Sequence, residues 1–321
     1  MQATSGRGIY PAVHKCDPLE FSMSTATVTA SSTILPHDPA SAQLFRNEFD
    51  RTAFAFSQSL HNLECFGYPA LLDIAKRFEA RQSGFHVEEE DTTPGKGWSI
   101  NAARKTLVEN LQEIEHSHSF VMLKRVHQEP EYKQILEDCI REVSDLTGLD
   151  IRKQYRDPLM TIMVTSPFRV TPYHMDAEAT LLMQMQAVKS IYIFDGNDRD
   201  VLPTSELERY WTGDINAVTY KQELQDRAKT FELVPGGGVF FPVTFPHWVQ
   251  NGPEVSISVS INFKRVKDNT ADVYRVNSRL RKIGLRPRDP GKVQLVDQAK
   301  GAIYRAIRNM KHTVDSRKPA A

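Results

Sequence analysis

The region between residues 159 and 263 constrains the fold of this chain more than any other feature. Its hydrophobic pattern changes from a helical period to alternation at every second residue, in short runs separated by turn residues. Such alternation predicts strands with one face turned to a core. The expected strands are 159–164, 180–194, 231–234, 239–242 and 254–263.

Helical patterns lie mostly on either side of these strands. Helices are expected at 69–78, 103–115, 129–147, 218–230 and 293–310. Short strands with tight turns, flanked by helices, predict a mainly β chain with α additions. The expected architecture is an antiparallel double-sheet barrel with N-terminal and C-terminal helices.

These patterns divide the 321 residues, 40% of them hydrophobic, into four parts. Residues 1–44 are rich in Ser, Thr and Ala, and we expect a flexible arm, with a docked edge strand as the alternative. Residues 45–154 form a helical and mixed part, 155–265 the strand-rich core, and 266–321 a basic helical segment.

Charge is unevenly distributed although the formal net charge is zero. Residues 264–321 hold 16 Lys and Arg against 5 Asp and Glu, which leaves 24 against 35 for residues 1–263. A solvated or self-complementary surface is the favoured interpretation, and a nucleic-acid partner is not favoured. An apolar stripe in the last helix, including Val296 and Ile303, is typical of a packing or dimer face, so packing within the chain and a homodimer through this helix are the alternatives.

The cysteines and the N-terminus indicate a compartment. Three widely spaced cysteines without a paired spacing, Cys16, Cys65 and Cys139, suit a reducing environment. The sequence has no signal-peptide pattern and no run of about 18 apolar residues. We therefore expect a cytoplasmic location and no membrane partner.

A metal site is indicated by His174-x-Asp176. The turn between them lets one imidazole and one carboxylate reach the same divalent ion, and His247, 71 residues past Asp176 (247 − 176), is the best third ligand. Two His and one carboxylate on one face of a metal are the arrangement of non-haem Fe(II) oxygenases. His116-x-His118 is a weaker candidate, because no further ligand follows at a suitable spacing.

Two strands carry polar residues that suit a ligand cavity. In residues 255–263 the serines and Asn262 share one face, which would line a cavity or simply face water. Lys189 falls on an otherwise apolar face of residues 181–194. A buried lysine needs an anion, and a bound carboxylate is one candidate; a side chain that reaches solvent is the other.

Together these residues resemble a known family. Thr171-Pro-x-His174-x-Asp176, Gln184, Lys189, the turn at 235–238, His247 and Ile261-Asn262-Phe263 are similar to the cupin-like, jumonji C branch of the Fe(II)/2-oxoglutarate oxygenases. The asparaginyl hydroxylases of the hypoxia-inducible factor are the branch that the chain resembles. The resemblance spans residues 155–265 and implies a double-stranded β-helix (cupin, or jelly-roll) catalytic core.

The resemblance also implies roles for single residues. The iron ligands would be His174, Asp176 and His247. The contacts to 2-oxoglutarate would be Lys189, Thr171 and Asn262, the first two at its distal carboxylate. Thr180 stands where the resembled branch has asparagine.

The implied activity is that of a dioxygenase. Three protein ligands leave three octahedral positions, two for 2-oxoglutarate and one for dioxygen. The enzyme would couple oxidative decarboxylation of 2-oxoglutarate to hydroxylation of a peptide or protein side chain or a small molecule. The alternative is a cupin-type metal- or ligand-binding regulatory protein without turnover. The sequence does not identify the primary substrate.

Overall fold

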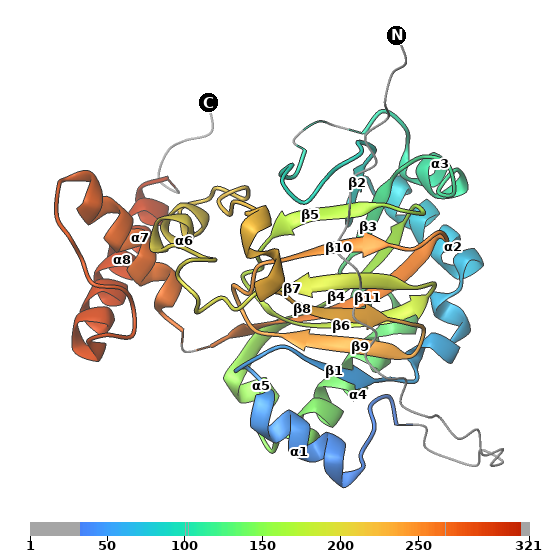
Figure 1. The fold of residues 1–321 in the computed structure, drawn as a ribbon, viewed down its shortest axis with the longest axis horizontal. Coiled ribbons are helices and arrows are strands. Elements are labelled where there is room, and N and C mark those ends of the chain that lie inside the picture. Colours follow the sequence, from blue (N-terminus) through green and yellow to red (C-terminus); the bar gives the residue numbers. More distant parts are fainter. Residues whose placement is uncertain (1–32, 100, 102, 267, 316–321) are drawn as a thin grey trace. The chain divides into compact units, whose positions relative to one another are not determined.

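Two antiparallel sheets form the centre of the computed structural model, which describes residues 33–99, 101, 103–266 and 268–315 (Figure 1). Most of the expected N-terminal arm lies outside the described residues. The strands are β1 (Phe54–Ser57), β2 (Phe85–Glu88), β3 (Phe120–Lys124), β4 (Tyr155–Thr165), β5 (Val170–His174), β6 (Ala179–Gln186), β7 (Lys189–Ile193), β8 (Lys229–Leu233), β9 (Gly237–Phe241), β10 (His247–Asn251) and β11 (Ser256–Arg265).

The strand order identifies the fold. The large sheet runs β1-β9-β6-β11-β4-β3-β2 and the small sheet β5-β10-β7-β8. From β4 to β11 the chain passes back and forth between the sheets, so that β5, β7, β8 and β10 lie in one and β4, β6, β9 and β11 in the other. This is a double-stranded β-helix, and the predicted fold class is confirmed.

The helices fall into two groups. They are α1 (Pro39–Glu48), α2 (Tyr68–Ala80), α3 (Leu107–Gln112), α4 (Pro130–Thr147), α5 (Ile151–Gln154), α6 (Thr204–Trp211), α7 (Thr270–Lys282) and α8 (Gln294–Asp315). Side chains from α1, α2 and α4, such as Phe45, Leu71 and Ile140, share one hydrophobic core with the large sheet. The other group, α6 to α8, packs together beside the barrel (Figure 1). No helix among the described residues is long and apolar enough to cross a membrane.

The expected strand at 180–194 is wrong as a single element, because the chain breaks at Ala187. Its φ of 62° lies in the left-handed region, which a continuous strand cannot adopt. The Gln184 side-chain amide fixes this turn by donating to the carbonyl oxygens of Gln186 (2.6 Å) and Ala187 (2.9 Å). β6 therefore stays in the large sheet, while β7, beginning at Lys189, belongs to the small sheet.

Other boundaries also differ from expectation. The segment 218–230 holds a 3-10 helix, Gln222–Arg227, and the start of β8 in place of a longer helix. The limit drawn at residue 44 falls inside α1, whose start is fixed locally: the Asp38 carboxylate accepts hydrogen bonds from the backbone N–H groups of Ala40 and Ser41, both at 3.0 Å. The described residues from Thr33 onward form one compact unit.

Candidate metal centre

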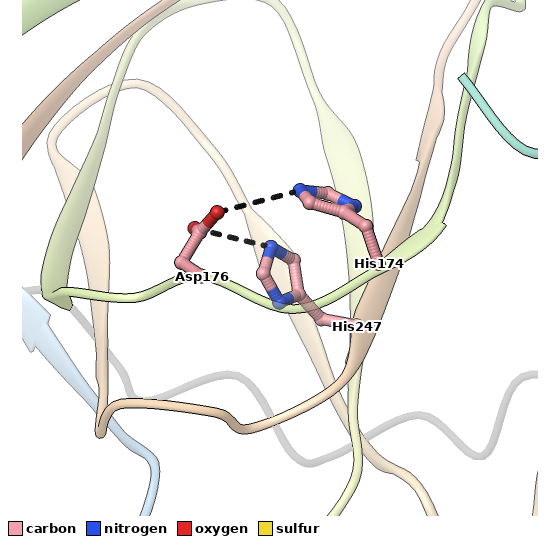
Figure 2. A group of neighbouring side chains, drawn as sticks. All are labelled: His174, Asp176 and His247. Atoms are coloured by element: carbon pink, nitrogen blue, oxygen red, sulfur yellow. Dashed lines mark ion pairs between the residues drawn. The ribbon is translucent and has the colours of Figure 1, made fainter. Parts of the chain in front are cut away.

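Strand pairing brings the three expected ligands together. β10 lies between β5 and β7, and its register places His247 opposite His174 at the end of β5. Asp176 lies two residues after the end of β5. Its Oδ1 lies 4.0 Å from His174 Nε2, and its Oδ2 lies 3.8 Å from His247 Nε2 (Figure 2). One ligand atom from each residue lies within 4.8 Å of the others. Their role as metal ligands remains a prediction.

Both histidines turn Nε2 toward the centre and Nδ1 toward a backbone carbonyl group. His174 Nδ1 lies 2.7 Å from the Pro172 carbonyl oxygen, and His247 Nδ1 lies 2.9 Å from that of Phe245. A carbonyl oxygen only accepts, so each Nδ1 donates to it, and Nε2 is the ring nitrogen of each histidine that is left to face an ion. A backbone acceptor behind the ring is the usual support of a metal-binding histidine.

The electrostatics of the three side chains also fit a cation. Burial raises the pKa of the Asp176 carboxyl, an effect that His174 opposes. Burial and the nearby His174 hold the pKa of His247 well below its usual range. A divalent ion would hold Asp176 ionised and His247 neutral.

Aromatic rings and a backbone contact hold these side chains in place. The ring centroid of Trp98 lies 5.0 Å from that of His174, and Phe241 lies 4.6 Å from His247. The backbone N–H of Thr244 donates to the carbonyl oxygen of Asp176 at 2.9 Å. The rings limit rotation of both imidazoles and keep water from one side of the centre.

A cavity of about 610 Å³ opens in front of the three side chains. The expected 2-oxoglutarate contacts, Thr171, Lys189 and Asn262, all line it together with the ligands. Lys189 is only 5% exposed, and burial lowers its pKa to about 7. No side chain among residues 33–99, 101, 103–266 and 268–315 forms an ion pair or hydrogen bond with its ammonium group, so an anionic ligand is its natural partner.

Strand register places Thr171 and Lys189 on the same side of the metal centre. His247 pairs with Ile193 of β7. Lys189 lies four residues from Ile193 on the same strand, which is about 13 Å at the usual rise per residue of a strand. Thr171 pairs with Val249, two residues past His247, or about 7 Å. A molecule with one acid group at the metal and another toward Lys189 suits this arrangement.

The serine face of β11 is only partly a cavity wall. Ser260 and Asn262 line the cavity, whereas Ser258 donates to Gln184 Oε1 at 2.7 Å, away from it. Of the two alternatives left open, the one with serines facing water is wrong, because Ser256, Ser258 and Ser260 are buried. The cavity alternative applies to Ser260 and Asn262 alone, because Gln184 occupies the part of the barrel beside Ser258. The Asn262 side-chain amide donates to Thr180 Oγ1 at 2.8 Å, which fixes its orientation and gives Thr180 a hydrogen-bonding role.

Several cavity residues were not expected from the sequence. Trp98 and Tyr210 come from loops and the insert after β7, and Glu88, Lys124 and Arg125 come from β2 and the end of β3. No spacing pattern connects them, since they meet only when these distant segments pack together. The pair His116-x-His118 is not part of the centre, which is the one metal-ligand cluster found in the described part of the chain.

Comparison with known proteins gives a likeness to solved structures alone. No family model and no curated protein matches the chain. The chain is similar to YcfD, a ribosomal oxygenase from Escherichia coli, with 13% identity and a TM-score of 0.46 over 88% of this chain and 68% of that one. A structure of YcfD with cobalt and 2-oxoglutarate matches 86% of this chain and 66% of its own at 13% identity and a TM-score of 0.45. The fold assignment rests on the chain's own strand order, and the chemistry rests on its own site.

Proposed function

We propose that this chain is an Fe(II)- and 2-oxoglutarate-dependent dioxygenase that hydroxylates a peptide or protein side chain or a small molecule. The observation that carries this proposal is a single cavity lined both by a candidate metal site and, in another part, by a buried cation. His174, Asp176 and His247 converge at one part of it, and the buried, unpaired Lys189 lines another. The metal would have open positions for the keto acid end of a ligand, and Lys189 would pair with a second carboxylate. This combination fits a 2-oxo acid with two carboxylates.

The side chains of the site would have two roles, to hold the metal and to orient 2-oxoglutarate. His174, Asp176 and His247 would hold the metal on one face and leave its other positions turned toward the cavity. Lys189 and Thr171 would fix the distal carboxylate of 2-oxoglutarate. The metal and this cosubstrate, when bound, supply the oxidising chemistry, so no side-chain base is needed at the reacting carbon.

The first test is a binding spectrum. Fe(II) and 2-oxoglutarate added without oxygen should give a visible charge-transfer band in the wild-type protein. His174→Ala should remove the band, while the matched control His118→Ala, a histidine outside the centre, should keep it. Absence of the band from iron-loaded wild-type protein would overturn the proposal.

A second measurement separates the enzyme from a binding protein without turnover. Cell extract incubated with protein, iron, ascorbate and 2-oxoglutarate should yield succinate together with a product heavier by one oxygen atom. Asp176→Ala provides the blank. Tight binding of 2-oxoglutarate without either product would favour the regulatory alternative.

The proposal extends to a homodimer in the cytoplasm. The C-terminal helical region exposes several large apolar side chains, which a second copy of the chain would cover: Ile283, Leu285, Leu295, Val296 and Ile303. The odd number and wide spacing of the three cysteines support this location.

A further inference from the structure

Every acidic side chain that lines the cavity already has a cationic partner or a place at the metal. Glu88 Oε2 lies 3.4 Å from Arg169 Nη2, and both side chains are almost fully buried. Glu178 Oε1 lies 3.0 Å from Lys264 Nζ. Asp176 belongs to the metal centre. The negative charge of the cavity wall is therefore satisfied.

The cations of the wall are in surplus. Lys189, Lys124 and Arg125 line the cavity, and within the described ranges no side-chain hydrogen bond or ion pair reaches any of the three. Desolvation lowers the pKa of Lys124, with no carboxylate to oppose it, although by surface area Lys124 and Arg125 are both exposed to solvent at the rim of the cavity. After burial itself, the charge of Arg125 is the next cause of the lowered pKa of His127. No acidic side chain of the described residues pairs with these positive charges; Lys189 is buried, whereas water screens Lys124 and Arg125 until a ligand displaces it.

Only one of the three cations is needed by the metal and 2-oxoglutarate. The formal charges of a divalent ion, Asp176, the two carboxylates of 2-oxoglutarate and Lys189 sum to zero. Lys124 and Arg125 are left over, and nothing in the proposed chemistry uses them. His86, a third basic residue nearby, already lies 3.5 Å from Glu88.

The two residues sit together at one border of the cavity. Lys124 ends β3, and Arg125 follows in a left-handed conformation, with φ of 60°, before the 3-10 helix Val126–Gln128. Strand register places Lys124 opposite Thr161 of β4, which in turn pairs with Ser260 of β11. Thr161 and Ser260 also line the cavity, so the cations lie two strands, about 10 Å, from the β11 wall.

We propose that Lys124 and Arg125 form a subsite that binds an anionic group, a carboxylate or a phosphate, of the primary substrate. This inference rests on the proposed function and deepens it by naming the substrate class. The anion would be held at the border of the cavity, away from Lys189, while the carbon to be oxidised reaches the metal. Positive charge at this position would favour substrates with a negatively charged group over neutral or positively charged ones.

The experiment selects binders from mixtures of defined composition. Wild-type protein with Mn(II) and 2-oxoglutarate is incubated with a random nonapeptide library, with the same library containing phosphoserine, and with a mixture of N-acetyl amino acids and sugar phosphates. Retained compounds are identified by mass spectrometry after rapid gel filtration. We expect acidic members to be enriched about tenfold over neutral ones. The three arms distinguish a peptide carboxylate from a phosphate and from a small acid.

Variants assign the enrichment to the two cations. Lys124→Gln/Arg125→Gln should lose it, and Lys124→Glu/Arg125→Glu should reverse it toward basic members. Arg46→Gln/Lys133→Gln, which removes the same charge from exposed helix positions outside the cavity, should retain it. Equal retention of acidic and neutral compounds by the wild type, or unchanged selection by the Gln variant, would overturn the subsite.

Failure of the proposed function would look different. Binding of Mn(II) and 2-oxoglutarate is measured on every preparation before the selection, and neither Gln variant should alter it. If the wild type binds neither, the dioxygenase proposal fails. The selection repeated without metal then still reports whether acids depend on Lys124 and Arg125.

Discussion

Lys189 has a pKa of about 7 in the fold, against an ordinary value of 10.5. The unfolded chain therefore binds more protons than the folded chain between these two values. Stability should rise with pH across this window, because the cost of burying the charged lysine is fully present below pH 7 and disappears above pH 10.5. The same cost is offset when a carboxylate binds beside the ammonium group.

Lys189→Met should therefore stabilise the metal-free protein near neutral pH by about 1–3 kcal/mol, since it removes a buried charge without a partner. It should also weaken 2-oxoglutarate binding by about a hundredfold while leaving metal affinity unchanged, because one partner of a buried charge pair is lost. Urea unfolding between pH 6.5 and 9.5 and calorimetric titration measure both effects. Lys153→Met, at an exposed lysine, is the control, and parallel loss of metal and 2-oxoglutarate would assign Lys189 a structural role.

Single residues were predictable where the sequence places them close together. His174 and Asp176 stand two positions apart, and Lys189 is conspicuous as a charge in an apolar run. Trp98 and Lys124 carry no such signal, because the packing of a loop places the first beside the cavity and strand pairing places the second there. A short motif can be read locally, whereas a cavity wall is assembled from distant segments.

At the scale of elements, the loop before β10 positions the carboxylate of the metal centre. The Thr244 N–H holds the Asp176 carbonyl, and Gly196 lies against the Thr244 carbonyl oxygen. A methyl group at Gly196 would overlap that oxygen and the Phe245 ring beside it. This glycine therefore allows the close approach of two backbone segments.

Gly196→Ala should displace the Thr244 loop and with it Asp176. We expect Mn(II) affinity to fall about tenfold and the unfolding temperature to drop by several degrees, as for a misplaced metal ligand and an overpacked contact. Electron paramagnetic resonance of free Mn(II) and thermal unfolding measure the two changes. The control is Gly95→Ala, where an added methyl group meets no atom within 4 Å; equal behaviour of the two variants would contradict the explanation.

Element boundaries show where sequence periodicity fails. Alternation continues through Ala187 and Val188, whose apolar side chains do not distinguish a turn from a strand, so residues 180–194 read as one strand. The break depends on a left-handed backbone angle and on hydrogen bonds from Gln184. The helix α1 was missed for another reason, since its stabilising contacts are a cap at Asp38 and packing against α4.

At the scale of the whole molecule, the C-terminal helices brace one wall of the cavity. Tyr210 of α6 lines the cavity. Its helix is held by the Arg281–Glu208 ion pair (2.8 Å) and by Arg275 Nε, which donates to the Trp211 carbonyl oxygen at 2.7 Å. Contacts made by α7 and α8 can therefore reach the cavity through α6, while the proposed metal ligands lie on β5 and β10 and in the loop after β5.

Leu295→Glu/Ile303→Glu should convert the proposed dimer to a monomer, because two charges would enter an apolar interface. Light scattering after gel filtration at tens of micromolar protein measures the mass. Metal affinity should be preserved, since the ligands lie outside the C-terminal helices. Gln294→Glu/Gln298→Glu adds the same charge to α8 without removing apolar side chains and should remain dimeric; a monomeric wild type would refute the proposal.

The pairing of β5 with β10 also sets the order of events during folding. His174 and His247 are 73 positions apart (247 − 174), and β10 must insert between β5 and β7 before they meet. Such long-range pairing forms slowly, because the loop must close before its contacts are gained. A growing or partly folded chain would therefore offer a metal ion at most two of the three proposed ligands. On the proposed function, the metal would bind last, to a chain whose barrel is already closed.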